Sequence, residues 1–143
     1  MSKPEVVVTA RDRRRLEEMI RSQRTVGDPY GAYLDAIQRR LRVASIVDDE
    51  AVDDQVATMH SRLRIRDASG GRSQLVTLVY PDETNPLVGH LSVLTTLGTA
   101  LLGLRAGDLV EWWAYRGKAE VFLEEVISQP SAEATSFAAV AKE

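Results

Sequence analysis

The spacing of apolar residues indicates a helix at the start of the chain. Leu16, Met19 and Ile20 follow one another at steps of three and one, and this spacing is typical of the buried face of a helix. Thr9 stands at the N-cap position before this stripe, and Asp12 follows three residues later, where a carboxylate approximates a capping box. The pattern predicts a first helix that begins directly after Thr9.

A turn and a second helix follow. The segment 25–31, TVGDPYG, holds Gly27, Pro29 and Gly31, which cannot share a helix interior. Apolar residues then recur at heptad-like positions, namely Tyr30, Tyr33, Leu34, Ile37, Leu41 and Ala44. Two helices of about 15 residues, each roughly 22 Å long, joined by a tight turn predict a short antiparallel helical hairpin.

From residue 61 onward the pattern changes to strands. Leu63 and Ile65 alternate with the arginines at 62, 64 and 66, a period of two. The turn DASGGRS leads into a return strand, QLVTLVYP, that Pro81 ends. A third strand is predicted at residues 91–94. A last β-hairpin is predicted to join LVEWWAY to KAEVFLEEVI.

A short helix is predicted at 97–104, between the third strand and the last hairpin. It should cover one face of an antiparallel sheet through the apolar residues Ala100, Leu101, Leu102 and Leu104. Gly103 and Gly107 allow the chain to end the helix and turn into the next strand. The expected class is therefore α+β, a helical hairpin followed by an antiparallel sheet with one short helix.

The chain divides into four parts on this basis. Residues 1–47 form the helical hairpin and residues 57–129 the sheet domain. Between them lies 48–56, which contains DDEAVDD and is expected to be a solvated connector of mutually repelling acids. The tail, 130–143, has no firm periodicity after Pro130 and is expected to be frayed.

Composition excludes several kinds of chemistry. The 143 residues include no Cys and two His, so we expect no disulfide, no dedicated metal site and no cofactor. His60, Ser61 and Asp67 can be combined on paper into a nucleophilic triad, but such combinations arise by chance. No apolar run approaches a membrane span and the short apolar start is no secretory signal, so the expected location is cytoplasmic.

Positive charge is concentrated in the first 46 residues, which carry ten Lys/Arg against six Asp/Glu although the whole chain has a net charge of −3. Acids are interspersed with these arginines, and no aromatic residues alternate with them as in base-stacking surfaces. We interpret the hairpin as a solvated helical surface or one that faces an acidic protein wall. Sequence-specific binding of nucleic acid is not expected.

Trp112 and Trp113 are adjacent on a predicted strand, so their side chains must face opposite sides of the sheet. One is expected in the core. The other is either an anchor for a partner, since Trp is enriched at interface hot spots, or half-covered by the hairpin or tail.

Three segments carry a family resemblance: VATMHSRLRIRD, LVTLVYP and LSVLTTLGTALLGLRAGDLVEW. Together with the preceding helical hairpin they resemble the Rnk family, regulators of nucleoside diphosphate kinase that are related to the bacterial Gre transcript-cleavage factors. The resemblance covers roughly residues 5–128. It implies an N-terminal antiparallel coiled coil and an FKBP-like C-terminal domain. It also implies binding to RNA polymerase, with the globular domain on the secondary-channel rim of the largest catalytic subunit and the coiled coil pointing inward.

The resemblance also identifies candidate site residues. In the cleavage factors, acids at the tip of a longer hairpin help to hold a catalytic Mg²⁺. The corresponding tip here comprises Arg24, Asp28 and Tyr30 and offers one carboxylate, whereas a metal site needs at least two converging oxygens. We therefore expect no transcript cleavage and no enzymatic activity.

The expected polymerase-binding residues are Leu94, Thr95, Thr96 and Gly98. The cleavage factors carry Asp-Ser-Pro at the positions of the first three, so only the hydroxyl is retained. Thr95 or Thr96 can instead cap the following helix. Isomerase activity of an FKBP-like sheet is not expected, because the chain has few aromatic residues to line a pocket.

The sequence thus predicts a non-catalytic regulator that binds RNA polymerase, competes with Gre-type factors and is a monomer or weak dimer. The alternative is a protein-binding module of the same fold. It would act on another partner, such as a nucleoside diphosphate kinase, or associate with itself.

Overall fold

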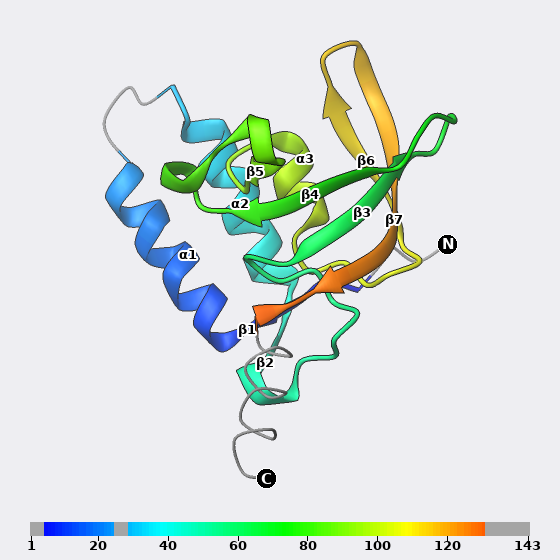
Figure 1. Cartoon of the computed structure of the whole chain (residues 1–143). Helices are drawn as coiled ribbons and strands as arrows, with labels where there is room; N and C mark the ends of the chain where they lie inside the picture. The colour runs from blue at the N-terminus through cyan, green and yellow to red at the C-terminus, as the bar shows by residue number, and fades with distance from the viewer. Residues whose placement is uncertain (1–4, 25–28, 131–143) are drawn as a thin grey trace, which may run out of the picture.

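Residues 5–24 and 29–130 are described by the computed structural model of the chain (Figure 1). The helices are α1 (Ala10–Gln23), α2 (Gly31–Val43) and α3 (Thr96–Leu101). The strands are β1 (Val7–Thr9), β2 (Ser45–Val47), β3 (Arg62–Asp67), β4 (Gln74–Val79), β5 (His90–Ser92), β6 (Leu109–Ala114) and β7 (Gly117–Ser128). Three short 3₁₀ turns are η1 (Asp49–Ala51), η2 (Pro81–Glu83) and η3 (Pro86–Val88). The α+β class is confirmed.

The first helix begins where the sequence predicts. The Thr9 side chain accepts a hydrogen bond from the Asp12 amide at 3.1 Å and so caps α1. The predicted capping box is wrong in one respect. The Asp12 carboxylate lies in the protein interior and accepts from the Met59 amide at 3.0 Å, so it joins α1 to the sheet domain.

The second helix buries a narrower stripe than predicted. Leu34, Ile37 and Leu41 are buried, whereas Tyr30 and Tyr33 are exposed. The helix starts only at Gly31, so Tyr30 lies before its first turn. The prediction that both tyrosines belong to the packed face was wrong.

Five strands form the main sheet, in the order β5-β4-β3-β7-β6. The pairs β3–β4, β3–β7 and β6–β7 are antiparallel, as expected, but β5 runs parallel to β4. The third strand is also shorter than predicted and ends at Ser92, whose hydroxyl accepts from the Leu94 amide at 3.0 Å. The long connection through η2 and η3 carries the chain back along β4 before β5 begins, which sets the parallel direction.

The short helix α3 covers one face of the sheet, and its predicted packing residues are all buried. The helix ends at Leu101, earlier than expected, because the chain turns at Gly103, which has φ +83°. A Cβ there would lie 2.6 Å from Val6 Cγ1, and the Gly103 carbonyl accepts from the Val7 amide at 3.0 Å. The absence of a side chain at Gly103 therefore leaves room for β1 to pack beside it. The small parallel sheet that β1 forms with β2 was not predicted.

The helical hairpin and the sheet domain share a hydrophobic core. This core combines hairpin residues with sheet-domain residues; it includes Leu16, Leu34, Ile37 and Leu41 together with Met59, Leu78, Val93 and Leu102. A second core lies between the sheet and α3 around Leu63, Leu101 and Leu123. The predicted boundaries between the helical hairpin and the sheet domain, at residues 47 and 57, stay a prediction. The shared core packs these two parts against each other (Figure 1).

The acidic segment 48–56 makes specific contacts. Asp49 accepts from the Arg11 amide at 3.1 Å, and Asp53 lies 2.7 Å from the guanidinium of Arg105. A hydrogen bond from the Gln55 amide and the contact with Arg105 lower the pKa of Asp53. These two acids are thus paired rather than only repelling their neighbours. The tail beyond Pro130 lies outside the described residues.

A candidate protein-binding surface

The loop before α3 holds the residues expected to contact polymerase, and two of them maintain the fold. Thr95 Oγ1 accepts from the Gly98 amide at 3.0 Å and donates to the Ser92 carbonyl at 2.8 Å. A Cβ on Gly98 would lie 2.1 Å from that same carbonyl oxygen. The capping role is therefore confirmed for Thr95, and Gly98 permits the close approach of α3 to β5.

The other two residues connect the loop to its neighbours. Leu94 is half-buried against the core shared with the hairpin. Thr96 Oγ1 donates to the Trp113 carbonyl at 2.6 Å and so ties the start of α3 to strand β6. We call Leu94, Thr95, Thr96 and Gly98 the α3 loop; its contact with a partner stays a prediction.

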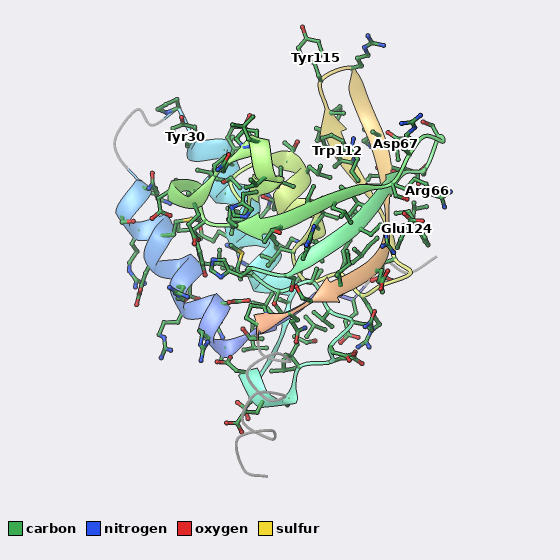
Figure 2. All side chains as sticks on the ribbon, viewed as in Figure 1. Tyr30, Arg66, Asp67, Trp112, Tyr115 and Glu124 are labelled. Carbon is green, nitrogen blue, oxygen red and sulfur yellow. The ribbon has the colours of Figure 1, made fainter. Side chains whose placement is uncertain are left out.

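The two adjacent tryptophans of β6 differ in burial. Trp112 is half-buried and packs against the core beneath α3. Trp113 faces the other side of the sheet and is 64% exposed. Tyr115 is fully exposed at the end of the hairpin and points away from the body of the protein (Figure 2). The expectation of one core and one surface tryptophan is confirmed.

Cations accompany these exposed rings. Lys118, which pairs with Trp113 across the two strands, places Nζ 5.7 Å from the indole centroid and 3.3 Å from Glu111. Arg116 lies beside Tyr115 in the turn and is exposed. We call Trp113, Tyr115, Arg116 and Lys118 the aromatic tip. The sequence analysis noted the tryptophan pair but did not identify Tyr115, Arg116 and Lys118 as part of a surface. The aromatic and cationic residues that follow one another in WAYRGK were the signal that could have identified them.

The candidate residues at the tip of the helical hairpin are partly engaged in contacts within the hairpin. Arg24 Nη2 contacts Asp35 at 2.7 Å and Gln38 at 2.9 Å, which bridges the ends of α1 and α2. Tyr30 is exposed, and Asp28 lies outside the described residues. Within 5–24 and 29–130, no group of three His, Asp or Glu side chains could hold a metal ion.

The structure does not bring His60, Ser61 and Asp67 together as a nucleophilic triad. Ser61 is fully buried and its hydroxyl lies 2.8 Å from that of Thr58. His60 Nε2 lies 2.8 Å from Glu83 Oε1. Asp67 accepts from the hydroxyl and the amide of Ser69 in the β3–β4 turn, and these contacts lower the pKa of its carboxyl. These side chains therefore maintain local structure.

An open groove lined by residues of α1 and α2 gathers part of the basic charge. It is lined by Arg13, Glu17, Ile20, Arg21, Gln38, Leu41 and Arg42. Arg13 is partly neutralised by Glu17 at 3.0 Å. The lining residues of this described groove include no aromatic ring on which a base could stack. The groove therefore suits an acidic protein surface better than a nucleic-acid base.

Comparison with known families identifies the class of protein to which the chain belongs. Residues 52–128 match the family model of the transcription elongation factor GreA/GreB C-terminal domain. The chain belongs to this GreA/GreB family, in agreement with the resemblance that the sequence suggested. The described part of the chain contains no helix long and apolar enough to cross a bilayer.

Individual relatives place the chain more closely. The regulator of nucleoside diphosphate kinase of Escherichia coli K12 is 34% identical over 112 residues, which are 78% of this chain and 80% of the relative. The transcription elongation factor GreA of Desulfovibrio desulfuricans is 28% identical over 57% of this chain and 51% of its own length. A solved GreA/GreB elongation factor from Nitrosomonas europaea superposes with a TM-score of 0.67 at 32% identity, covering 86% of this chain and 98% of that one. The regulator of nucleoside diphosphate kinase and the Nitrosomonas structure thus both match this chain over most of its length.

Proposed function

We propose that this protein is a non-catalytic transcription regulator that binds RNA polymerase at the rim of its secondary channel through the sheet domain. The observation that carries the proposal is the family match over the sheet domain, combined with relatives named transcription elongation factors. On this proposal the α3 loop and the surface around it face the polymerase. The protein competes there with Gre-type factors and acts as a monomer or weak dimer.

The short helical hairpin supports the absence of cleavage activity. Helix α1 has 14 residues and α2 has 13, so each is about 20 Å long at the usual rise per residue. Delivering a Mg²⁺ into a distant active site requires at least two oxygen ligands at the end of a long arm. Here the hairpin packs against its own domain, and Arg24 and Asp35 at its end neutralise each other.

A second candidate is favoured by one observation, the name of the Rnk relative. That protein is called a regulator of nucleoside diphosphate kinase, so this chain is also a candidate to bind such a kinase through the same fold. The two candidates differ in partner and share the prediction that the protein binds rather than catalyses.

The test is direct binding of the full chain to core RNA polymerase, in competition with a transcript-cleavage factor and with RNA cleavage followed in parallel. Mutually exclusive binding without cleavage is the expected result. No binding at tens of micromolar, together with binding to nucleoside diphosphate kinase, would replace the first candidate by the second. The full chain is required, because removal of residues 1–46 would expose the sheet-domain half of the shared core.

A further inference from the structure

The groove between α1 and α2, which we call the hairpin groove, contains two arginines whose charge is not neutralised. Arg21 lines it from α1 and Arg42 from α2. Both are exposed, and neither forms an ion pair with any residue of 5–24 or 29–130. Ile20 and Leu41 line the same groove and are buried. The hairpin groove therefore presents two free guanidinium groups beside an apolar floor.

The acidic segment 48–56 presents free charges of the opposite sign. Asp48, Glu50 and Asp54 are exposed, and none of them forms an ion pair within the described part of the chain. The one hydrogen bond of the Asp54 carboxylate comes from the Gln55 side chain at 3.5 Å, the outer limit for such a contact. The segment thus offers three carboxylates to another molecule.

The acidic segment is held in place by other contacts of the same stretch. Asp49 pairs with Arg11 at 3.1 Å, and Asp53 pairs with Arg105 at 2.7 Å. Gln129 Nε2 donates to the Asp53 carbonyl at 2.9 Å. The pairing with Arg11 places the segment at the end of the helical hairpin where α1 begins (Figure 1). A segment that is already ordered loses less conformational entropy on binding.

We propose that this protein associates with itself, and that the hairpin groove of one copy receives the acidic segment of a second copy. Both complementary surfaces belong to this chain, with Arg21 and Arg42 on one side and Glu50 and Asp54 on the other. From Arg13 to Arg21 the groove extends about 12 Å along α1, and the stretch from Glu50 to Asp54 spans at most about 14 Å. The two lengths are compatible. This inference goes beyond the proposed function and does not depend on polymerase binding.

The lining of the hairpin groove favours an acidic protein segment over nucleic acid. Glu17 lies in the groove and would repel phosphates, and the lining includes no aromatic ring for a base. Exposed ion pairs are individually weak and are screened by salt. The association is therefore expected only at high protein concentration and low salt.

Sedimentation equilibrium of the full-length protein measures this association. The average mass is expected to rise between about 10 μM and about 1 mM protein, the range in which a contact built on a few exposed ion pairs forms. Raising NaCl from about 0.01 M to about 1 M shortens the Debye length from about 30 Å to about 3 Å and is expected to abolish the rise. Repulsion between two copies that each carry a net charge of −3 would give the opposite salt dependence.

Two charge-reversal variants test the two sides of the contact. R21E/R42E makes the groove acidic, and E50R/D54R makes the segment basic. Each is expected to raise the Kd of self-association by about tenfold or more, because like charges then face each other. An equimolar mixture of the two variants again pairs opposite charges on both sides, so it is expected to recover the association of the wild type.

R14E/R39E is the matched control for R21E/R42E. It makes the same change of charge on the same two helices, at exposed residues that do not line the groove, and should leave the Kd within about twofold. Urea midpoints check that every variant is folded. Should R21E/R42E lose stability because Arg42 lies in the last turn of α2, R21Q/R42Q removes the attraction without adding negative charge and is also expected to weaken association.

Three results would overturn the inference. The first is a wild type that stays monomeric at the highest protein concentration and the lowest salt. The second is association that R21E/R42E and E50R/D54R leave unchanged. The third is a mixture of these variants that does not associate while R14E/R39E associates normally. These experiments contain no polymerase, so their failure leaves the proposed function standing, and a failed polymerase assay leaves self-association standing.

Discussion

Arg40 is the residue that tests how firmly the helical hairpin is attached to the sheet domain. Its guanidinium reaches from α2 to the end of α3, where Nε donates to the Leu102 carbonyl at 2.8 Å and Nη2 to the Ala100 carbonyl at 2.7 Å. Carbonyls at a helix C-terminus have no partner within the helix. Arg40→Met keeps the apolar stem and removes both hydrogen bonds.

The expected loss of stability follows from three contributions. Burial lowers the pKa of Arg40 to about 10 from 12.5, which corresponds to a desolvation penalty of about 3 kcal/mol. Two hydrogen bonds from a charged donor contribute about 1.5–3 kcal/mol each and offset that penalty. Removing them also leaves two partly buried carbonyls without a donor, at about 1–3 kcal/mol. We expect R40M to lower the free energy of unfolding by about 3 kcal/mol.

Urea unfolding followed by tryptophan fluorescence measures this loss, because Trp112 packs against the core. The matched control is Arg39→Ala, since Arg39 is the exposed neighbour on the same helix, and it should change stability by no more than about 0.5 kcal/mol. Arg40→Lys should fall between, because an ammonium group keeps the charge but loses the fork of donors. R40M as stable as the R39A control would refute the view that Arg40 fixes the hairpin to α3.

Three further predictions concern the α3 loop and Asp12. Gly98→Ala should lower the free energy of unfolding by roughly 3 kcal/mol or more, measured in urea, because its Cβ would lie 2.1 Å from the Ser92 carbonyl oxygen; a shift below 1 kcal/mol would contradict the close approach. Thr95→Ala should lower it by about 1 kcal/mol through loss of the helix cap, and Thr95→Ser, which keeps the hydroxyl, should restore it. Burial raises the pKa of Asp12 above 3.8, so ionisation of this carboxyl opposes folding and its contribution to stability falls as pH rises through that range. Asp12→Asn, which keeps an oxygen for the Met59 amide, should therefore gain stability relative to the wild type between pH 3 and pH 7, and a difference that does not vary with pH would be evidence against this.

The sequence predicts those elements whose periodicity coincides with a single buried face. Leu16 with Ile20, and Leu63 with Ile65, are buried as their spacing indicates. The parallel pairing of β5 was not predictable in this way, because three residues carry no signal for strand direction. The same holds for β1, whose residues pair with β2 residues 38 positions later in the sequence and which depends on the space left by Gly103.

The candidate site was predictable to a smaller extent. Adjacent tryptophans on a strand necessarily face opposite sides, but the sequence alone does not say which of Trp112 and Trp113 is exposed. The position of α3 decides it, because the helix covers the face to which Trp112 belongs. The role of Arg40 was also missed, since on a helix rich in arginines nothing local distinguishes the one whose partners are backbone carbonyls sixty residues away.

The predicted variants separate the fold from the binding surface, and this separation is itself informative about function. R40M acts on a contact between the hairpin and α3, whereas R21E/R42E reverses two exposed charges and leaves the core unaltered. If the hairpin contributes to polymerase binding only by supporting the sheet domain, R40M should reduce affinity no more than its unfolded fraction requires. A larger reduction in a folded R40M variant would mean that the orientation of the hairpin, fixed by Arg40, is part of what the partner recognises.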